Sequence, residues 1–101
     1  MGFKIIWPDD AIDDLRQLVA TIAKDNPTAA RAFGHKILAE LAPLARFPRM
    51  GRVYAELGRD DVRELPVPPY RVIYRVDDVG QTVTVLVVWH GAMRGPPRLP
   101  E

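Results

Sequence analysis

The sequence predicts an α+β fold in which an antiparallel sheet packs on an N-terminal helix hairpin, in the order β-α-α-β-β-β. Apolar residues recur at helical spacing through residues 9–41. Through residues 62–90 they alternate or run continuously, as in strands, and the segment between these regions has neither period. At 101 residues, 48% of them hydrophobic, the chain is expected to form one domain, residues 1–101, with residues 91–101 as a C-terminal tail.

The N-terminal region is predicted to begin with a short strand and to continue as a helix. Residues 3–7 form an apolar run that contains the β-branched Ile5 and Ile6 and stops at Pro8. Pro8 has a backbone φ suited to a first helical turn, and the two aspartates after it place negative charge at the positive end of the helix dipole. The face of this helix that is expected to be buried carries Ala11, Leu15, Leu18 and Ile22.

A second helix is expected to follow directly, because the sequence Asp25-Asn26-Pro27 ends the first one. Asn26 is the expected N-cap of the second helix, and Pro27 suits its first position. Its apolar stripe consists of Ala30, Phe33, Ile37 and Leu41, and Pro43 should end or kink it near Leu41. With almost no linker between them, the two helices should form an antiparallel hairpin with a shared apolar face.

The C-terminal region is predicted to be a sheet that follows an exposed loop at residues 47–61. Residues 62–65 are a short strand candidate, which the prolines at positions 66, 68 and 69 keep from extending far. Residues 70–76 alternate, so that Tyr70, Val72, Tyr74 and Val76 share one face and Arg71, Ile73 and Arg75 share the other. After a turn at residues 77–80, residues 82–89 are almost continuously apolar, which predicts a central strand covered on both faces.

The composition excludes several classes of site. Because the chain has no cysteine, disulfides, thiolate metal sites and cysteine nucleophiles are ruled out. The only two histidines, His35 and His90, lie far apart, and the sequence has neither a glycine-rich phosphate loop nor a serine nucleophile elbow. We therefore expect no metal and no cofactor. The first residues do not form a signal peptide and no run reaches membrane-spanning length, so a cytoplasmic location is expected.

The arginines of the predicted sheet are the first candidate functional residues. The net charge of +1 argues neither for nor against nucleic acid, but the basic residues after Glu40 are arginines. Since the helices should cover the more apolar face, Arg71 and Arg75 are expected on the open face, where Arg63 could join them. Such a cluster fits an anionic partner, and the alternative is cross-strand pairing with Glu64 or Asp77.

The histidines are the second set of candidates. His35 lies roughly 200° around its helix from Phe33, which predicts a solvated surface position. His90 ends the buried strand, where an imidazole can project from a rigid element. It could hydrogen-bond the sheet edge, or it could contact a partner or transfer a proton, and the residues alone leave both possibilities open.

The order and spacing of four segments resemble the RelE/ParE superfamily of bacterial toxins over nearly the whole chain. These segments read DNPTAARAF, RFPRMGR, RELPVPPYRVIYRV and TVTVLVVWHGAMR. The resemblance implies the toxin of a type II toxin–antitoxin pair, a growth inhibitor of the kind that stabilises plasmids, held inactive by a cognate protein antitoxin. RelE-like members are ribosome-dependent mRNA endoribonucleases that need no metal, whereas ParE-like members act on DNA gyrase.

Carried over to this sequence, the resemblance gives two sets of site residues. Under the nuclease alternative, Arg71 and His90 match catalytic residues, although no lysine follows position 36 and Gly91 stands where a tyrosine is usual. Arg63, Arg71, Arg75 and Arg94 are the expected partner-binding residues. Because DNPTAARAF is more ParE-like, we favour a non-nucleolytic toxin directed at gyrase. The ribosome-dependent nuclease is the alternative, and a stand-alone protein-binding module is a third possibility.

Overall fold

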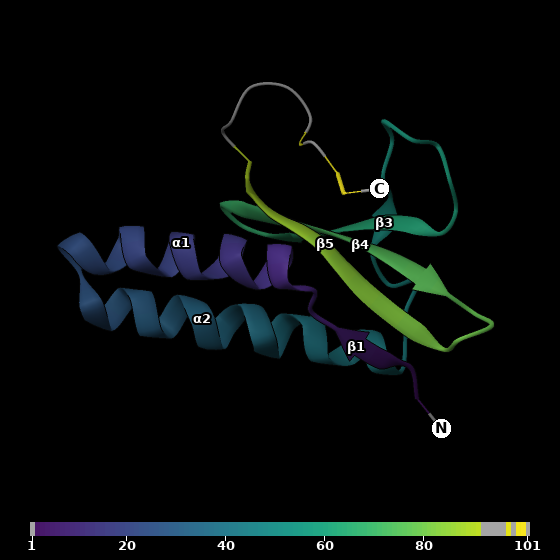
Figure 1. Ribbon diagram of the computed structural model, residues 1–101, viewed down its shortest axis with the longest axis horizontal. Helices are drawn as coiled ribbons and strands as arrows, with labels where there is room; N and C mark the ends of the chain where they lie inside the picture. Colours follow the sequence, from purple (N-terminus) through teal and green to yellow (C-terminus); the bar gives the residue numbers. More distant parts are fainter. Residues whose placement is uncertain (1, 92–96, 98, 101) are drawn as a thin grey trace.

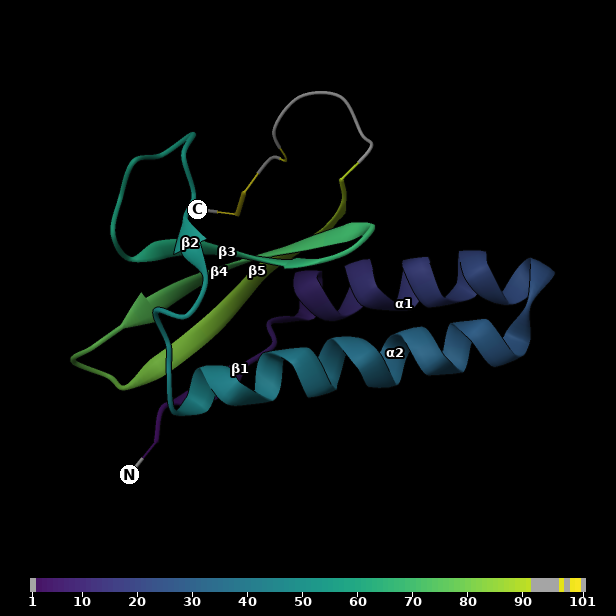
Figure 2. The same ribbon diagram turned by 180° about the vertical axis from the view of Figure 1, so that it is seen from behind.

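The computed structural model has two layers, in which a helix hairpin covers one face of a five-stranded sheet (Figure 1). The structure describes residues 2–91, 97, 99 and 100. The turn of the hairpin projects well beyond the strands in both views (Figures 1 and 2), which gives an elongated molecule of 42 × 32 × 22 Å. No helix in the described part of the chain is long and apolar enough to cross a membrane.

The N-terminal elements confirm the predicted helix hairpin. A strand, β1 (Lys4–Ile6), leads into α1 (Asp9–Asp25), whose first turn carries Asp9 and Asp10. The second helix, α2 (Pro27–Leu41), is capped by the side chain of Asn26, which accepts a hydrogen bond of 3.0 Å from the backbone N–H of Ala29. Pro43 does not kink α2 but lies in a short 3-10 helix, η1 (Ala42–Ala45), that continues from it.

The sheet contains β2 (Arg52–Val53), β3 (Val62–Val67), β4 (Tyr70–Asp77) and β5 (Thr82–His90) in addition to β1. Their order is β1-β5-β4-β3-β2, and neighbours pair antiparallel except for β1, which runs parallel to β5. The predicted α+β class is therefore confirmed, with a mixed sheet. The parallel pair is possible because no hairpin joins β1 to β5, so the connection does not fix their relative direction.

Two further details of the sheet differ from the expectation of an antiparallel sheet with a loop at residues 47–61. β2 lies inside the segment expected to be a loop, and β3 runs through Pro66 to Val67. A proline is tolerated there because β2 pairs only with Arg63 and Glu64, which leaves the outer edge of β3 open beyond them. β5 lies between β1 and β4 as expected of an interior strand, and a bulge opposite Ile73 and Tyr74 gives it one extra residue.

Two hydrophobic clusters form on opposite faces of the sheet. The larger cluster lies between the sheet and the helices, where Val72, Tyr74 and Val76 of β4 meet Ile37 and other helical residues. A smaller cluster lies on the other face, which we call the open face, and consists of Tyr54, Val62, Ile73 and Leu86. Leu99 packs against this second cluster. The rest of the predicted tail falls largely outside the described residues, so its role stays a prediction.

The loop between η1 and β3 is attached to the sheet by a small set of polar contacts. The buried hydroxyl of Tyr74 accepts a 2.9 Å hydrogen bond from the backbone N–H of Gly51. Arg49 donates two hydrogen bonds to Asp78 in the β4–β5 turn and a third to Asp60. These contacts hold β2 beside β3, which positions Arg52 and Tyr54 over the open face.

Candidate partner-binding face

The alternation of β4 is as predicted. Val72, Tyr74 and Val76 belong to the cluster under the helices, and the ring of Tyr70 contacts Phe33 of α2 with centroids 4.6 Å apart. Ile73 belongs to the cluster on the opposite face. Arg71 and Arg75, which alternate with the helix-facing residues, therefore project from the open face.

Arg63 does not join them. It is the register partner of Tyr74, and its neighbours Val62 and Glu64 take the open face, so Arg63 projects from the side that the helices cover. Its guanidinium donates to the backbone oxygens of Arg49, Gly51 and Asp60 and forms an ion pair with the Asp60 carboxylate. The expectation that Arg63 lies on the open face is wrong, because the residue lies near the sheet edge and its charge is satisfied by the adjoining loop.

Arg71 is held by a buried carboxylate. Its Nε donates to Oε2 of Glu64, which also accepts a 3.2 Å hydrogen bond from Arg52, and the Glu64 residue is only 3% exposed. Burial by itself would raise the pKa of Glu64, but the hydrogen bonds from the two arginines outweigh it and the pKa lies below its ordinary value. The cross-strand alternative with Glu64 is therefore the arrangement that Arg71 adopts.

Arg75 lies at the opposite end of the same face. It pairs in register with Val62 and Thr84, and its side chain borders a cavity of about 160 Å³ with Asp10 and Leu86. Within the described residues its guanidinium forms neither a hydrogen bond nor an ion pair. Of the three predicted sheet arginines, Arg75 is thus the one whose guanidinium is not engaged by a carboxylate of the described chain.

His90 is separated from Arg71 by the sheet. It pairs in register with Tyr70, and its ring meets the Tyr70 ring edge-on with centroids 5.0 Å apart, on the side of Phe33 and α2. Arg71 instead pairs in register with Trp89 and projects from the open face. The two residues that would act together in a nuclease therefore lie on opposite faces.

His35 is exposed on α2, as expected, and Arg94 lies outside the described residues.

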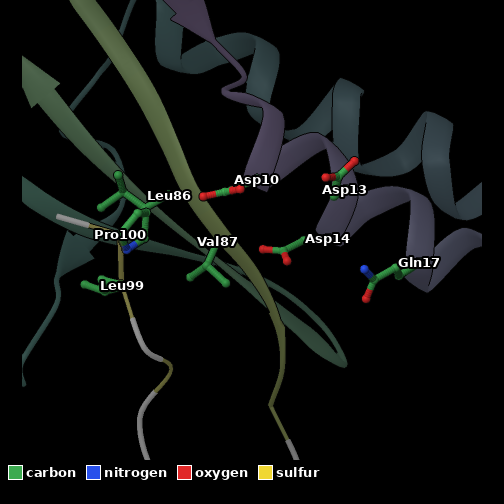
Figure 3. Close-up of a pocket in the computed structure, with 8 residues that line it drawn as sticks. All are labelled: Asp10, Asp13, Asp14, Gln17, Leu86, Val87, Leu99 and Pro100. Atoms are coloured by element: carbon green, nitrogen blue, oxygen red, sulfur yellow. The ribbon is translucent and has the colours of Figure 1, made fainter.

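A groove runs between α1 and β5 at the edge of the open face (Figure 3). Its volume is about 410 Å³, and Asp10 and Asp14 direct their carboxylates from α1 toward Leu86 and Val87 of β5. Burial raises the pKa of Asp14, an effect that a hydrogen bond with the Val88 backbone partly offsets. The sequence places these aspartates on the polar face of a helix but does not indicate that β5 lies beside them.

The most important residues that sequence reasoning missed are Arg52 and Tyr54. Both lie in the segment expected to be a loop, and only the two-residue pairing of β2 with β3 places them over the sheet. The available signal was the sequence Arg-Val-Tyr at residues 52–54, in which β-branched and aromatic residues favour a strand. In the described part of the chain, no group of three His, Cys, Asp or Glu residues could hold a metal ion.

Comparison with known proteins gives one family match. Residues 5–95 match the model of a family described as the ParE toxin of the type II toxin–antitoxin system parDE. No curated protein sequence matches the chain.

Solved toxin structures share the fold. A chromosomal ParDE system from P. aeruginosa has a TM-score of 0.72 at 20% identity, over 87% of this chain and 95% of that chain. The toxin–antitoxin complex RelBE2 from Mycobacterium tuberculosis has a TM-score of 0.58 at 27% identity, over 89% and 99% of the two chains. A mutant of E. coli toxin RelE in the free state has a TM-score of 0.66 at 19% identity, over 91% and 86%.

Proposed function

The chain belongs to the ParE toxin family of type II toxin–antitoxin systems, and on this basis we propose that its cellular target is DNA gyrase. It is a ParE-like toxin, and its partner is a cognate protein antitoxin. The proposal places its action in the cytoplasm and assigns it no nuclease chemistry. The alternative is cleavage of mRNA on the ribosome, which we also test because the fold resembles that of E. coli RelE.

The separation of Arg71 and His90 is the observation that carries this proposal. A nuclease of this size needs a proton-transfer group and a phosphate-binding group within hydrogen-bond reach of one scissile bond. Here the imidazole packs on Tyr70 at the helix-covered side, whereas the guanidinium lies on the open face. A phosphate bound to Arg71 on the open face would have the sheet between it and the His90 imidazole.

The charge around Arg71 supports the same conclusion. Glu64 occupies the Nε side of the guanidinium, so an incoming phosphate would have to compete with a carboxylate that is already desolvated. The net charge of +1 is also low for a protein that must bind ribosomal RNA, because phosphate contacts dominate such affinity. Neither feature hinders recognition of a protein target.

The target can be identified with purified toxin and with induced cells. Added to gyrase and relaxed plasmid, the toxin should inhibit supercoiling or trap cleaved DNA, and the toxin–antitoxin complex at the same concentration is the control that should do neither. In cells, induction should cause filamentation and a DNA-damage response. Rapid mRNA cleavage within translated codons, with gyrase unaffected, would establish the nuclease alternative instead.

Replacement of His90 by glutamine should leave toxicity nearly unchanged. Glutamine keeps hydrogen-bonding capacity but cannot transfer a proton at neutral pH, so a catalytic role would be lost along with the ring contact to Tyr70. The measurement is the number of colonies that survive induction of wild-type and H90Q toxin at equal protein levels. A nuclease would lose roughly 10²-fold or more of its activity. Such a loss, with antitoxin binding preserved, would refute the gyrase proposal.

Replacement of Arg75 by alanine should weaken antitoxin binding about tenfold, the effect typical of a charged interface residue. We propose that Arg75 and Arg71 contact the antitoxin from the open face, together with Arg94, which lies outside the described residues. Arg63 is engaged by its own loop and is not part of this proposal. The affinity is measured by calorimetry, and R16A on the exposed side of α1 is the matched control. Equal affinity of R75A and R16A would show that this end of the face is not an interface.

A further inference from the structure

Tyr54 buries a hydroxyl that has no hydrogen-bond partner in the described structure. The residue follows β2, and its backbone N–H donates a 2.9 Å hydrogen bond to the carbonyl of Val62, which fixes it beside β3. Its ring packs with Ile73 and Leu86 in the open-face cluster, and the residue is 1% exposed. A buried hydroxyl without a partner destabilises the free protein, so its retention calls for an explanation.

A second unpartnered donor occurs on the same face. The indole of Trp89 is 7% exposed, and its Nε1 has no hydrogen-bond partner among the described residues. Trp89 pairs in register with Arg71 and therefore shares the open face with it. On the helix-covered face, by contrast, the buried hydroxyl of Tyr74 has a partner, because it accepts a hydrogen bond from the backbone N–H of Gly51. Among the described residues, the buried side-chain donors without a partner thus lie on the face that no helix covers.

Tyr54 also contributes to the wall of a cavity, while its hydroxyl is buried in the free toxin. A cavity of about 420 Å³ adjoins it, lined mainly by apolar residues. Its lining consists of Tyr54, Glu56, Leu57, Arg59, Leu99 and two prolines, Pro97 and Pro100. Leu99 of the same chain packs on the cluster to which Tyr54 belongs, which shows that this surface accepts an aliphatic side chain.

The charges around the cavity favour a neutral acceptor over an anionic one. Arg59 is engaged by Asp61 through two hydrogen bonds, and Arg71 is engaged by Glu64. Glu56 has no such partner in the described chain and would repel a carboxylate or a phosphate. Burial, followed by the charge of Glu56, raises the pKa of Tyr54, so the hydroxyl keeps its proton at neutral pH and can donate.

We propose that Tyr54 binds a main-chain carbonyl of an extended antitoxin segment, whose neighbouring apolar side chain enters the cavity, and that Trp89 donates separately to the same segment. The inference rests on the proposed function, because it names the contact by which the toxin recognises its antitoxin. An extended segment is required since the carbonyls within a helix are already paired, whereas those of an extended peptide are available. The segment supplies the acceptor that the buried hydroxyl lacks in the free toxin.

The test is Tyr54→Phe, which should have opposite effects on the free toxin and on the complex. Without the unpartnered hydroxyl, the free variant should unfold at a higher urea concentration than the wild type. The same variant should bind the purified full-length cognate antitoxin about tenfold more weakly. Trp89→Phe should also bind it more weakly and provides a second measurement at an independent donor.

Tyr74→Phe is the matched control, because it removes the same hydroxyl group from the opposite face. It should lower the urea midpoint, since the N–H of Gly51 loses its acceptor, and leave the affinity of the folded toxin unchanged.

If the wild type binds the antitoxin and Y54F binds it equally well, the inference is overturned while the proposed function stands. If the wild type does not bind the antitoxin, the proposed function fails as well. A ten-nucleotide RNA that binds the wild type but not Y54F would assign the acceptor to nucleic acid and would also overturn the inference.

Discussion

Replacement of Gly51 by alanine is expected to destabilise this toxin by about 3 kcal/mol or more, because two effects add. A Cβ at position 51 would lie 2.6 Å from the Tyr74 hydroxyl and 2.7 Å from the backbone oxygen of Glu64. The backbone oxygen cannot move without displacing β3. The loop must therefore shift, and the hydrogen bond from the Gly51 N–H to Tyr74 is then lost in a buried setting.

The same substitution at Gly34 is the control for this prediction. Gly34 lies within α2, where an added Cβ would meet only Val19 Cγ2 at an ordinary contact distance of 3.8 Å. Alanine should therefore stabilise the helix by about 0.5–1 kcal/mol. In thermal unfolding, G51A should lower the melting temperature by roughly 10 °C or more, whereas G34A should raise it. Equal melting temperatures for G51A and the wild type would mean that the loop is not held closely against the sheet.

Replacement of Glu64 by glutamine is expected to lower the free energy of unfolding by about 2–3 kcal/mol at neutral pH. Glutamine preserves the size of the side chain but removes the charge to which Arg71 and Arg52 both donate. Arg71 is then left partly buried without a counter-charge, its side chain being only 26% exposed. Arg52 is less affected because water reaches most of its side chain.

The loss of stability caused by E64Q should become smaller as the pH falls. The pKa of Glu64 is lowered in the folded protein, so its carboxylate contributes stability that is present above its ordinary pKa of about 4.3 and is lost as the pH falls through the folded value. The pKa values of Asp60, Asp61 and Asp78 are lowered as well, by hydrogen bonds from arginines. These three aspartates lie in largely exposed ion pairs, which salt screens, whereas the Glu64 pair is buried.

Urea unfolding in about 1 M salt separates the contribution of Glu64 from that of the exposed aspartate ion pairs, because salt screens the exposed pairs. The wild type should be more stable than E64Q at pH 7, and the two should converge as the pH falls toward 3, because protonated Glu64 resembles glutamine. A stability difference that stays constant from pH 7 to pH 3 would show that packing, and not the charge of Glu64, holds Arg71.

The helix hairpin could be predicted almost to the residue because its signals are local. Asn26 and Pro27 mark the junction between the helices by their own backbone and capping preferences, without reference to the rest of the chain. The alternation of β4 was predictable for the same reason. Its pattern is regular over seven residues, and the helix-facing set is the more apolar one.

The face of Arg63 could not be predicted, because β3 does not alternate cleanly. Val62 faces the open-face cluster while Leu65 and Val67 face the helices, so the apolar residues of this strand serve both sides. Arg63 was expected to join the other arginines on the open face, but Val62 takes that face within the second cluster and Arg63 therefore takes the other. That cluster depends on Tyr54 and on the bulge in β5, and both arise from pairing between distant segments.

The parallel pairing of β1 with β5 has a consequence for synthesis of the toxin. Lys4–Ile6 leave the ribosome well before their partners Thr82–Thr84 have been made. Until then β1 has no neighbouring strand, and the apolar faces of both helices lack the β5 residues that cover them. The nascent toxin therefore cannot complete its fold, or the open face of its sheet, until β5 has been made.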